Sequence, residues 1–144
     1  MVTSIHGRRG ALVALLLWAF ACAAPALAQD PRVSAAQAAA RDWLVLTDAG
    51  NVTASYGAAG EKYRTVLTAD QWTKALVSVR TPLGAVAQRT FANGQIGKPQ
   101  GAPDGEYAMV VFRTAFANKT DTAETLTLER ESDGKWRVIG YSIR

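Results

Sequence analysis

The chain is 144 residues long and carries 16 basic and 12 acidic side chains, for a formal net charge of +4. This length fits one domain that can bury a core, and the basic residues are scattered without the cluster that is typical of nucleic-acid binding. The single histidine and the single cysteine, His6 and Cys22, both lie near the start of the chain.

The first 28 residues show the order of a cleavable export signal. Arg8-Arg9 precedes the uncharged run 11–24, and Ala26-Leu27-Ala28 then offers small residues in front of a cleavage point. A membrane-crossing helix needs roughly 20 apolar residues, so this run is too short for one. The sequence therefore predicts cleavage between Ala28 and Gln29.

Cleavage there leaves a single domain of residues 29–144, in the periplasm of a bacterium or secreted from it, with no stable membrane span. Two alternatives use the same segment, namely lipid attachment at Cys22 and twin-arginine export through Arg8-Arg9. The net charge falls from +4 to +2 because the two arginines leave with the signal.

The remaining domain has neither histidine nor cysteine. This excludes a disulfide, a Ser-His-Asp or Cys-His nucleophile, the common zinc sites, and haem ligation through histidine or cysteine. Only carboxylate, lysine, tyrosine, serine or threonine chemistry remains, and no cofactor is expected.

Two well-marked helices are predicted. Ser34 is an N-cap that begins a capping box, and the apolar residues after it recur at helical spacing over 34–49. A second capping box at Thr68 precedes a helix over 69–80, which Pro82 is expected to stop.

Residues 51–66 have a weaker helical pattern, because Gly57 and Gly60 lower helix propensity. The segment predicts either one bent helix or two short ones. Tyr56 and Tyr63 lie seven residues apart on one face of it. They are interpreted as core residues with hydroxyls at the rim, or alternatively as hydrogen-bond donors in a ligand-binding cup.

The pattern then changes to strands. The segment 106–117 is apolar on both faces, which indicates a central strand, and 122–131 alternates, which indicates one wet face. The predicted fold class is α+β, with three N-terminal helices packed on one face of a curved four-stranded antiparallel sheet. The predicted strands are 84–95, 106–117, 122–131 and 135–144, and residues 118–121 form the turn between the second and the third.

Several short stretches between residues 39 and 144 together carry a resemblance to a known family. They are Ala39-Ala40-Arg41-Asp42-Trp43-Leu44, Asp70-Gln71-Trp72, Arg80-Thr81-Pro82-Leu83-Gly84, Pro103-Asp104-Gly105-Glu106-Tyr107, Phe112-Arg113-Thr114, Phe116-Ala117-Asn118-Lys119 and Gly134-Lys135-Trp136-Arg137-Val138-Ile139-Gly140-Tyr141. With them the chain resembles a bacterial family, the domain of unknown function numbered four thousand and nineteen. The resemblance implies an exported single domain and brings no activity with it. The order of three helices and then a curved sheet is also similar to the nuclear-transport-factor-like cone fold.

Arg113 interrupts the apolar run of the second strand. A buried arginine needs a partner, since an unpaired charge inside a protein is costly. We expect an ion pair with Asp42, Glu61 or Glu106, or a side chain that reaches water at the sheet margin. The alternative is an anion clamp inside the cone.

Three glutamates of the last hairpin are interpreted as a solvated face, not as a catalytic carboxylate pair. Glu124, Glu129 and Glu131 are expected to pair with Lys135 and Arg137 across the strands.

The tryptophans Trp43, Trp72 and Trp136 are expected in the core. Asp104-Gly105-Glu106 supplies two carboxylates, fewer than the six to eight oxygens that calcium takes, so no metal site is expected.

Three functions remain open. The leading hypothesis is a non-catalytic exported domain that binds a small apolar ligand or a periplasmic protein partner. The second is a cone-fold enzyme in which a carboxylate, Asp42 or Glu61, acts as base beside tyrosine donors. The third is an assembly role, such as a homodimer, through the open sheet face.

Overall fold

The computed structural model describes residues 28–144. The predicted export signal, with His6 and Cys22, lies outside the described residues. Helices come first and an antiparallel sheet of strand order β1-β2-β3-β4 follows, so the α+β prediction is confirmed. The elements are α1 (Pro31–Asp48), α2 (Val52–Ala58), α3 (Glu61–Val66), α4 (Ala69–Leu83), β1 (Val86–Ile96), β2 (Glu106–Phe116), β3 (Lys119–Arg130) and β4 (Trp136–Ile143).

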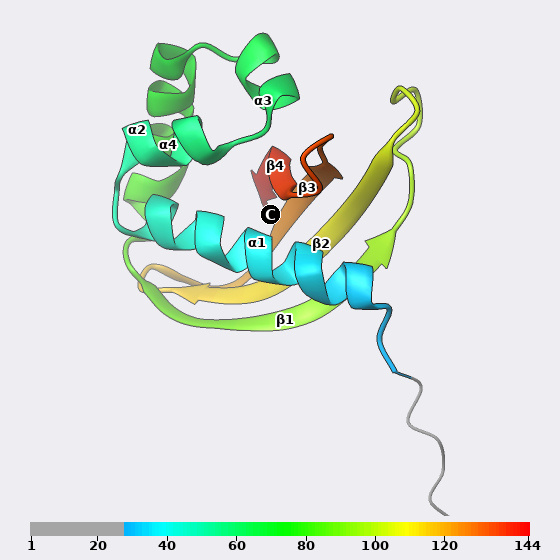
Figure 1. The fold of residues 1–144 in the computed structure, drawn as a ribbon. Coiled ribbons are helices and arrows are strands. Elements are labelled where there is room, and N and C mark those ends of the chain that lie inside the picture. Colours follow the sequence, from blue (N-terminus) through cyan, green and yellow to red (C-terminus); the bar gives the residue numbers. More distant parts are fainter. Residues whose placement is uncertain (1–27) are drawn as a thin grey trace, which may run out of the picture.

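The sheet curves around α1. Figure 1 shows α1 lying across the sheet, with α2, α3 and α4 grouped beyond its C-terminal end. Bulges interrupt the register of each strand pair, as between Phe91 and Asn93 and between Thr127 and Leu128, and bulges bend strands. As predicted, β2 is a central strand.

The first helix begins earlier than predicted. Asp30 is its N-cap and accepts a hydrogen bond from the Arg32 amide, while Pro31 occupies the first turn. Proline suits that position because its missing N–H would be unpaired there anyway. The prediction of an N-cap at Ser34 was therefore wrong.

The weak helical segment is two short helices, one of its two predicted forms. The chain is extended between them, and the Gly60 amide donates to the Val138 carbonyl at 2.8 Å. A side chain at position 60 would clash with β4, because a Cβ there would lie 2.7 Å from Ile139 Cγ2. Gly60 thus ties the helices to β4.

Two expected boundaries were also wrong. The helix α4 continues through Pro82 to Leu83, and its C-cap is Gly84, whose φ is 76°. Pro82 removes its own N–H from the helix, but the last turn still closes because the Gly84 amide donates to the Arg80 carbonyl. The β2–β3 turn is shorter than predicted, since Phe116 already pairs with Lys119. The Ala117 amide donates to the Ala85 carbonyl, and the Asn118 amide donates to the Leu83 carbonyl. These two hydrogen bonds hold the turn against the α4–β1 junction.

The core fills the space between the helices and the sheet. Trp43 and Trp72 are each 3% exposed and their rings lie 5.5 Å apart, which confirms their expected burial. Trp136 is half-buried against the same cluster. No helix in residues 28–144 is long and apolar enough to cross a bilayer.

Candidate functional site

A buried carboxylate, Glu124, lies between the sheet and the helices and is fully inaccessible to solvent. Its Oε2 accepts hydrogen bonds from Arg89 Nε at 2.6 Å and from the Thr114 hydroxyl. Its Oε1 accepts from Arg89 Nη2 at 3.2 Å and from the Tyr141 hydroxyl at 2.6 Å. Each oxygen thus accepts two hydrogen bonds, which matches its two lone pairs.

A second carboxylate extends this network toward the surface. Asp48, at the end of α1, accepts from Arg89 at 2.6 Å and from Arg80 of α4 at 2.6 Å. Arg80 also lies 3.9 Å from Glu124, so two acids and two arginines join α1, α4, β1 and β3. We call Asp48, Arg80, Arg89, Glu124 and Tyr141 the buried ion network.

The network holds its charges in place. Burial alone would raise the pKa of Asp48, but hydrogen bonds from Arg89 and Arg80 keep that pKa below its usual value. Burial alone would lower the pKa of Arg89, and hydrogen bonds to both acids outweigh it, so the pKa is raised. Burial and the neighbouring Glu124 charge raise the pKa of Tyr141. The phenol therefore remains a donor.

Sequence reasoning placed Glu124 on a solvated face, and this was wrong. The interpretation holds for Glu131, which pairs with Arg137 at 2.6 Å, while Glu129 pairs with Lys62 of α3 instead. The alternation of β3 contained the missed signal. Glu124 shares its phase with Leu126 and Leu128, and all three are fully buried.

An apolar hollow opens between α4 and the end of β4. We call it the Tyr63 hollow; its volume is about 320 Å³. Small-molecule sites have roughly 300–1,000 Å³ and apolar, aromatic linings with a few polar groups. The lining of this hollow fits that description: Tyr63, Leu67, Trp72, Ala75, Leu76, Val79, Tyr141, Ser142 and Ile143.

The two predicted tyrosines have different roles. Tyr63 is 5% exposed, packs edge-on against Trp72 and has no hydroxyl hydrogen bond to any of residues 28–144. Burial raises its pKa to about 12. The Tyr56 hydroxyl instead donates to the Leu67 carbonyl at 2.7 Å, so it joins α2 to the end of α3 and does not line the hollow.

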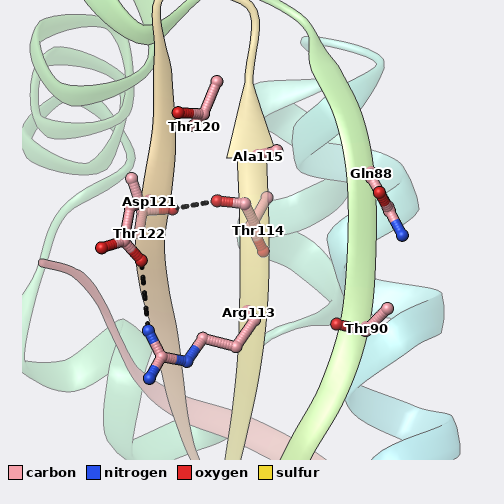
Figure 2. A pocket seen from close by; sticks show the side chains of 8 residues that line it. All are labelled: Gln88, Thr90, Arg113, Thr114, Ala115, Thr120, Asp121 and Thr122. Atoms are coloured by element: carbon pink, nitrogen blue, oxygen red, sulfur yellow. Dashed lines mark hydrogen bonds and ion pairs between the residues drawn. The ribbon is translucent and has the colours of Figure 1, made fainter.

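Arg113 lies on the outer face of the sheet, away from the helices. Its side chain is 68% exposed and pairs with Asp121 at 3.1 Å, not with the three acids named from the sequence. Figure 2 shows the two side chains reaching toward one another. Both line a shallow hollow with a volume of about 190 Å³. The expectation of an arginine in water is met, and an anion clamp inside the cone is not.

The outer face is largely polar around this pair. Gln88, Thr90 and Thr120 also line the shallow hollow, and Met109 is the one large hydrophobic side chain of β2 that is exposed within the described residues. A large apolar interface would need more apolar surface than this. A homodimer through this face stays a prediction.

The two carboxylates proposed as catalytic bases are both exposed. Asp42 lines a hollow between α1 and β4, and Glu61 lines a hollow beside Lys62 and Glu129; neither lining contains a tyrosine. Among residues 28–144 no cluster of three or more His, Cys, Asp or Glu could hold a metal ion.

Comparisons with known proteins agree on fold and family. A family model described as "Protein of unknown function (DUF4019)" matches residues 39–141. The structure is similar to that of a candidate ketosteroid isomerase from Shewanella frigidimarina NCIMB 400, with a TM-score of 0.50 and 17% identity, over 76% of this chain and 94% of that one. At this identity the likeness shows the fold, the nuclear-transport-factor-like cone. No curated protein matches the sequence.

Proposed function

The chain belongs to the DUF4019 family, and from the geometry of its described residues we propose that it is an exported, non-catalytic domain that binds a small apolar ligand in the Tyr63 hollow. The observation that carries this proposal is the hollow itself. Its lining combines the Trp72 indole and aliphatic side chains with Tyr63, whose hydroxyl has no partner among residues 28–144 and can donate to a ligand. The pKa of about 12 keeps this hydroxyl protonated at neutral pH.

The buried ion network supports the non-catalytic part. A general base needs a lone pair directed at the proton it removes. Glu124 has both oxygens occupied by arginine, threonine and tyrosine donors and has no exposed surface. Tyr141 touches the Tyr63 hollow, but its hydroxyl is held by Glu124. The carboxylate and the tyrosine hydroxyl are therefore occupied by one another and by the rest of the network, which leaves neither of them free to act on a substrate.

The start of α1 is compatible with export. Cleavage after Ala28 would leave the N-cap Asp30 and the first-turn Pro31 in place. Ala28 and Gln29 are exposed and precede the helix, so their separation would break no contact of the helix cap. We propose the periplasm as the compartment. N-terminal sequencing of the exported protein tests the cleavage of the signal, and Gln29 is the expected first residue.

Ligand binding is tested with a neutral fluorescent amine, N-phenyl-1-naphthylamine, and a matched pair of variants on α4. Val79 lines the hollow and is 45% exposed, while Val77 is 52% exposed and does not line it. Val79→Phe should fill the hollow and abolish binding of the probe, and Val77→Phe should leave binding unchanged. Equal binding by both variants would overturn the proposal.

A protein partner is a second candidate, favoured by one feature of the same hollow. Tyr141, Ser142 and Ile143 all line it although alternate side chains of a strand point to opposite faces, so the hollow reaches the edge of β4. Arg144 pairs with Ala123 through both backbone groups, which directs the Ile143 backbone groups outward. An extended peptide could add to this edge.

Mass spectrometry of the protein purified from its own compartment separates the two candidates. A co-purifying small apolar molecule supports ligand binding, and a co-purifying protein that is lost after substitution of Ile143 by proline supports edge pairing. The proline removes the outward N–H without touching the ladder to β3.

A further inference from the structure

A second hollow, separate from the Tyr63 hollow, lies between α1, the end of α2 and the start of β4. Its volume is about 400 Å³, and we call it the Asp42 hollow. Ala39 and Leu46 of α1, and the indole of Trp136, make part of its lining apolar. Gly57 borders it as well, and a Cβ built at Gly57 would meet no atom within 4 Å. The space beside that glycine is therefore open.

Three charged side chains also line the Asp42 hollow, and one of them is already neutralised. Arg137 donates to Glu131 at 2.6 Å and to Asp133 at 2.9 and 2.7 Å. Asp42 and Lys135 differ from it, because neither side chain forms an ion pair or hydrogen bond within residues 28–144, with the other or with any other group. Within the described part of the chain, the hollow therefore presents one carboxylate and one ammonium group that have no partner and lie on different elements.

Two opposite charges that do not pair across an apolar surface suit a ligand that carries both charges. A ligand with only a positive charge would face the like charge of Lys135, and a ligand with only a negative charge would face the like charge of Asp42. A zwitterion satisfies both groups with charge-assisted hydrogen bonds, which are stronger than neutral ones. Its apolar part would then cover the Trp136 indole and Leu46.

We propose that the Asp42 hollow binds a small zwitterion with an apolar side chain, of which a free α-amino acid is the simplest example. The ligand ammonium pairs with Asp42, the ligand carboxylate pairs with Lys135, and the side chain lies toward Gly57. This site does not depend on the function proposed for the Tyr63 hollow, because its five defining residues, Asp42, Leu46, Gly57, Lys135 and Trp136, are absent from that lining.

The probe is L-leucine, titrated calorimetrically into the purified protein. N-acetyl-L-leucine lacks the positive charge and L-leucinamide lacks the negative charge, while both retain the side chain. We expect L-leucine to bind and each analogue to bind at least about tenfold more weakly, a factor that corresponds to about 1.4 kcal/mol. No binding of L-leucine at about 10 mM by folded protein, far above a millimolar dissociation constant, would overturn the proposal.

Variants then locate the site. Asp42→Asn and Lys135→Gln should each weaken leucine binding at least about tenfold with an unchanged melting temperature, since both side chains are exposed and unpaired. Gly57→Phe should abolish binding by filling the open space, and Asp121→Asn on the outer face is the matched control that should bind normally. Leucine binding that survives Gly57→Phe, or that falls equally with Asp121→Asn, would show that the hollow is not the site.

Discussion

Glu124 of β3 accepts hydrogen bonds from side chains of the other three strands, and Arg80 of α4 lies 3.9 Å from it. Its carboxylate is fully buried, and Arg89 and Tyr141 reach it from two strands. A buried ion pair contributes little net stability compared with apolar residues of the same shape, but removal of one partner leaves an uncompensated charge. Loss of Glu124 alone is therefore expected to lower the free energy of unfolding strongly, whereas replacement of the whole network by apolar residues would change it little.

Glu124→Ala should lower the free energy of unfolding by about 3–5 kcal/mol, because Arg89 keeps only Asp48 as a partner. Urea denaturation followed by circular dichroism measures this. The control is Arg113→Met, which breaks an exposed pair and should change stability by less than about 1 kcal/mol. Similar values for the two variants would mean that Glu124 reaches solvent.

Tyr63 makes stability depend on alkaline pH. Burial raises its pKa from 10.0 to about 12, so the folded protein disfavours the phenolate. A raised pKa of this kind gives stability that is complete below pH 10 and is lost as the pH rises toward 12. We expect Tyr63→Phe to flatten the stability curve in this range, measured by melting temperature against pH. A curve unchanged by the substitution would contradict burial of the Tyr63 side chain as the cause of the raised pKa.

The prediction of the elements succeeded where the pattern is local. Periodicity and the Thr68 capping box located the helices, and the alternation of Leu126 and Leu128 located the inner face of β3. The network could not be predicted in the same way. Glu124 is 35 residues from Arg89, and Arg89 is 41 residues from Asp48, so only the folded chain shows that they meet.

Helix boundaries failed for a different reason. Ser34 and Asp30 are both good N-caps by residue type, but Pro31 directly after Asp30 is favoured in the first turn of a helix, and the prediction of Ser34 did not use this signal. Pro82 was expected to stop the helix, but a proline removes only one backbone hydrogen bond. The helix α4 continues past it to Leu83.

The two glycines of the α2–α3 segment offer a test of how that segment docks. Gly60→Ala should destabilise the protein, because its Cβ would lie 2.7 Å from Ile139 Cγ2 and 3.1 Å from Glu131 Oε1. Gly57→Ala is the matched control. It lies within α2 beside open space, and alanine is favoured over glycine in helices by about 1 kcal/mol, so stability should hold or rise.

Thermal melts of both variants measure the difference. The free energy of unfolding should fall for Gly60→Ala and not for Gly57→Ala. If Gly60→Ala melts like the unchanged protein, the close approach of Gly60 to Ile139 does not constrain how the helices dock on β4.

At the scale of the whole molecule, the last strand connects every layer. Tyr141 packs against Trp43 and Trp72 of two helices, with ring centres 5.3 and 6.4 Å away, and its hydroxyl donates to Glu124. The Arg144 backbone exchanges two hydrogen bonds with Ala123. Chain ends usually fray, but this one is joined to the core, the buried ion network and the sheet.

Deletion of residues 140–144 should therefore leave the domain unfolded or badly weakened. It removes the Tyr141 and Ile143 side chains, which would be worth roughly 1.5–3 kcal/mol each if fully buried and somewhat less here, because both are partly buried. It also takes a donor from Glu124 and removes the strand that forms one wall of the Tyr63 hollow. Domains of this size have about 5–15 kcal/mol in total, so losses of this kind exhaust much of it. Circular dichroism melting of the truncated protein measures the outcome.

A shorter deletion, of Arg144 alone, is the control and should melt cooperatively a few degrees lower, because it loses two backbone hydrogen bonds and no core side chain. Cooperative melting of the longer deletion at the original temperature would mean that β4 contributes nothing to the fold.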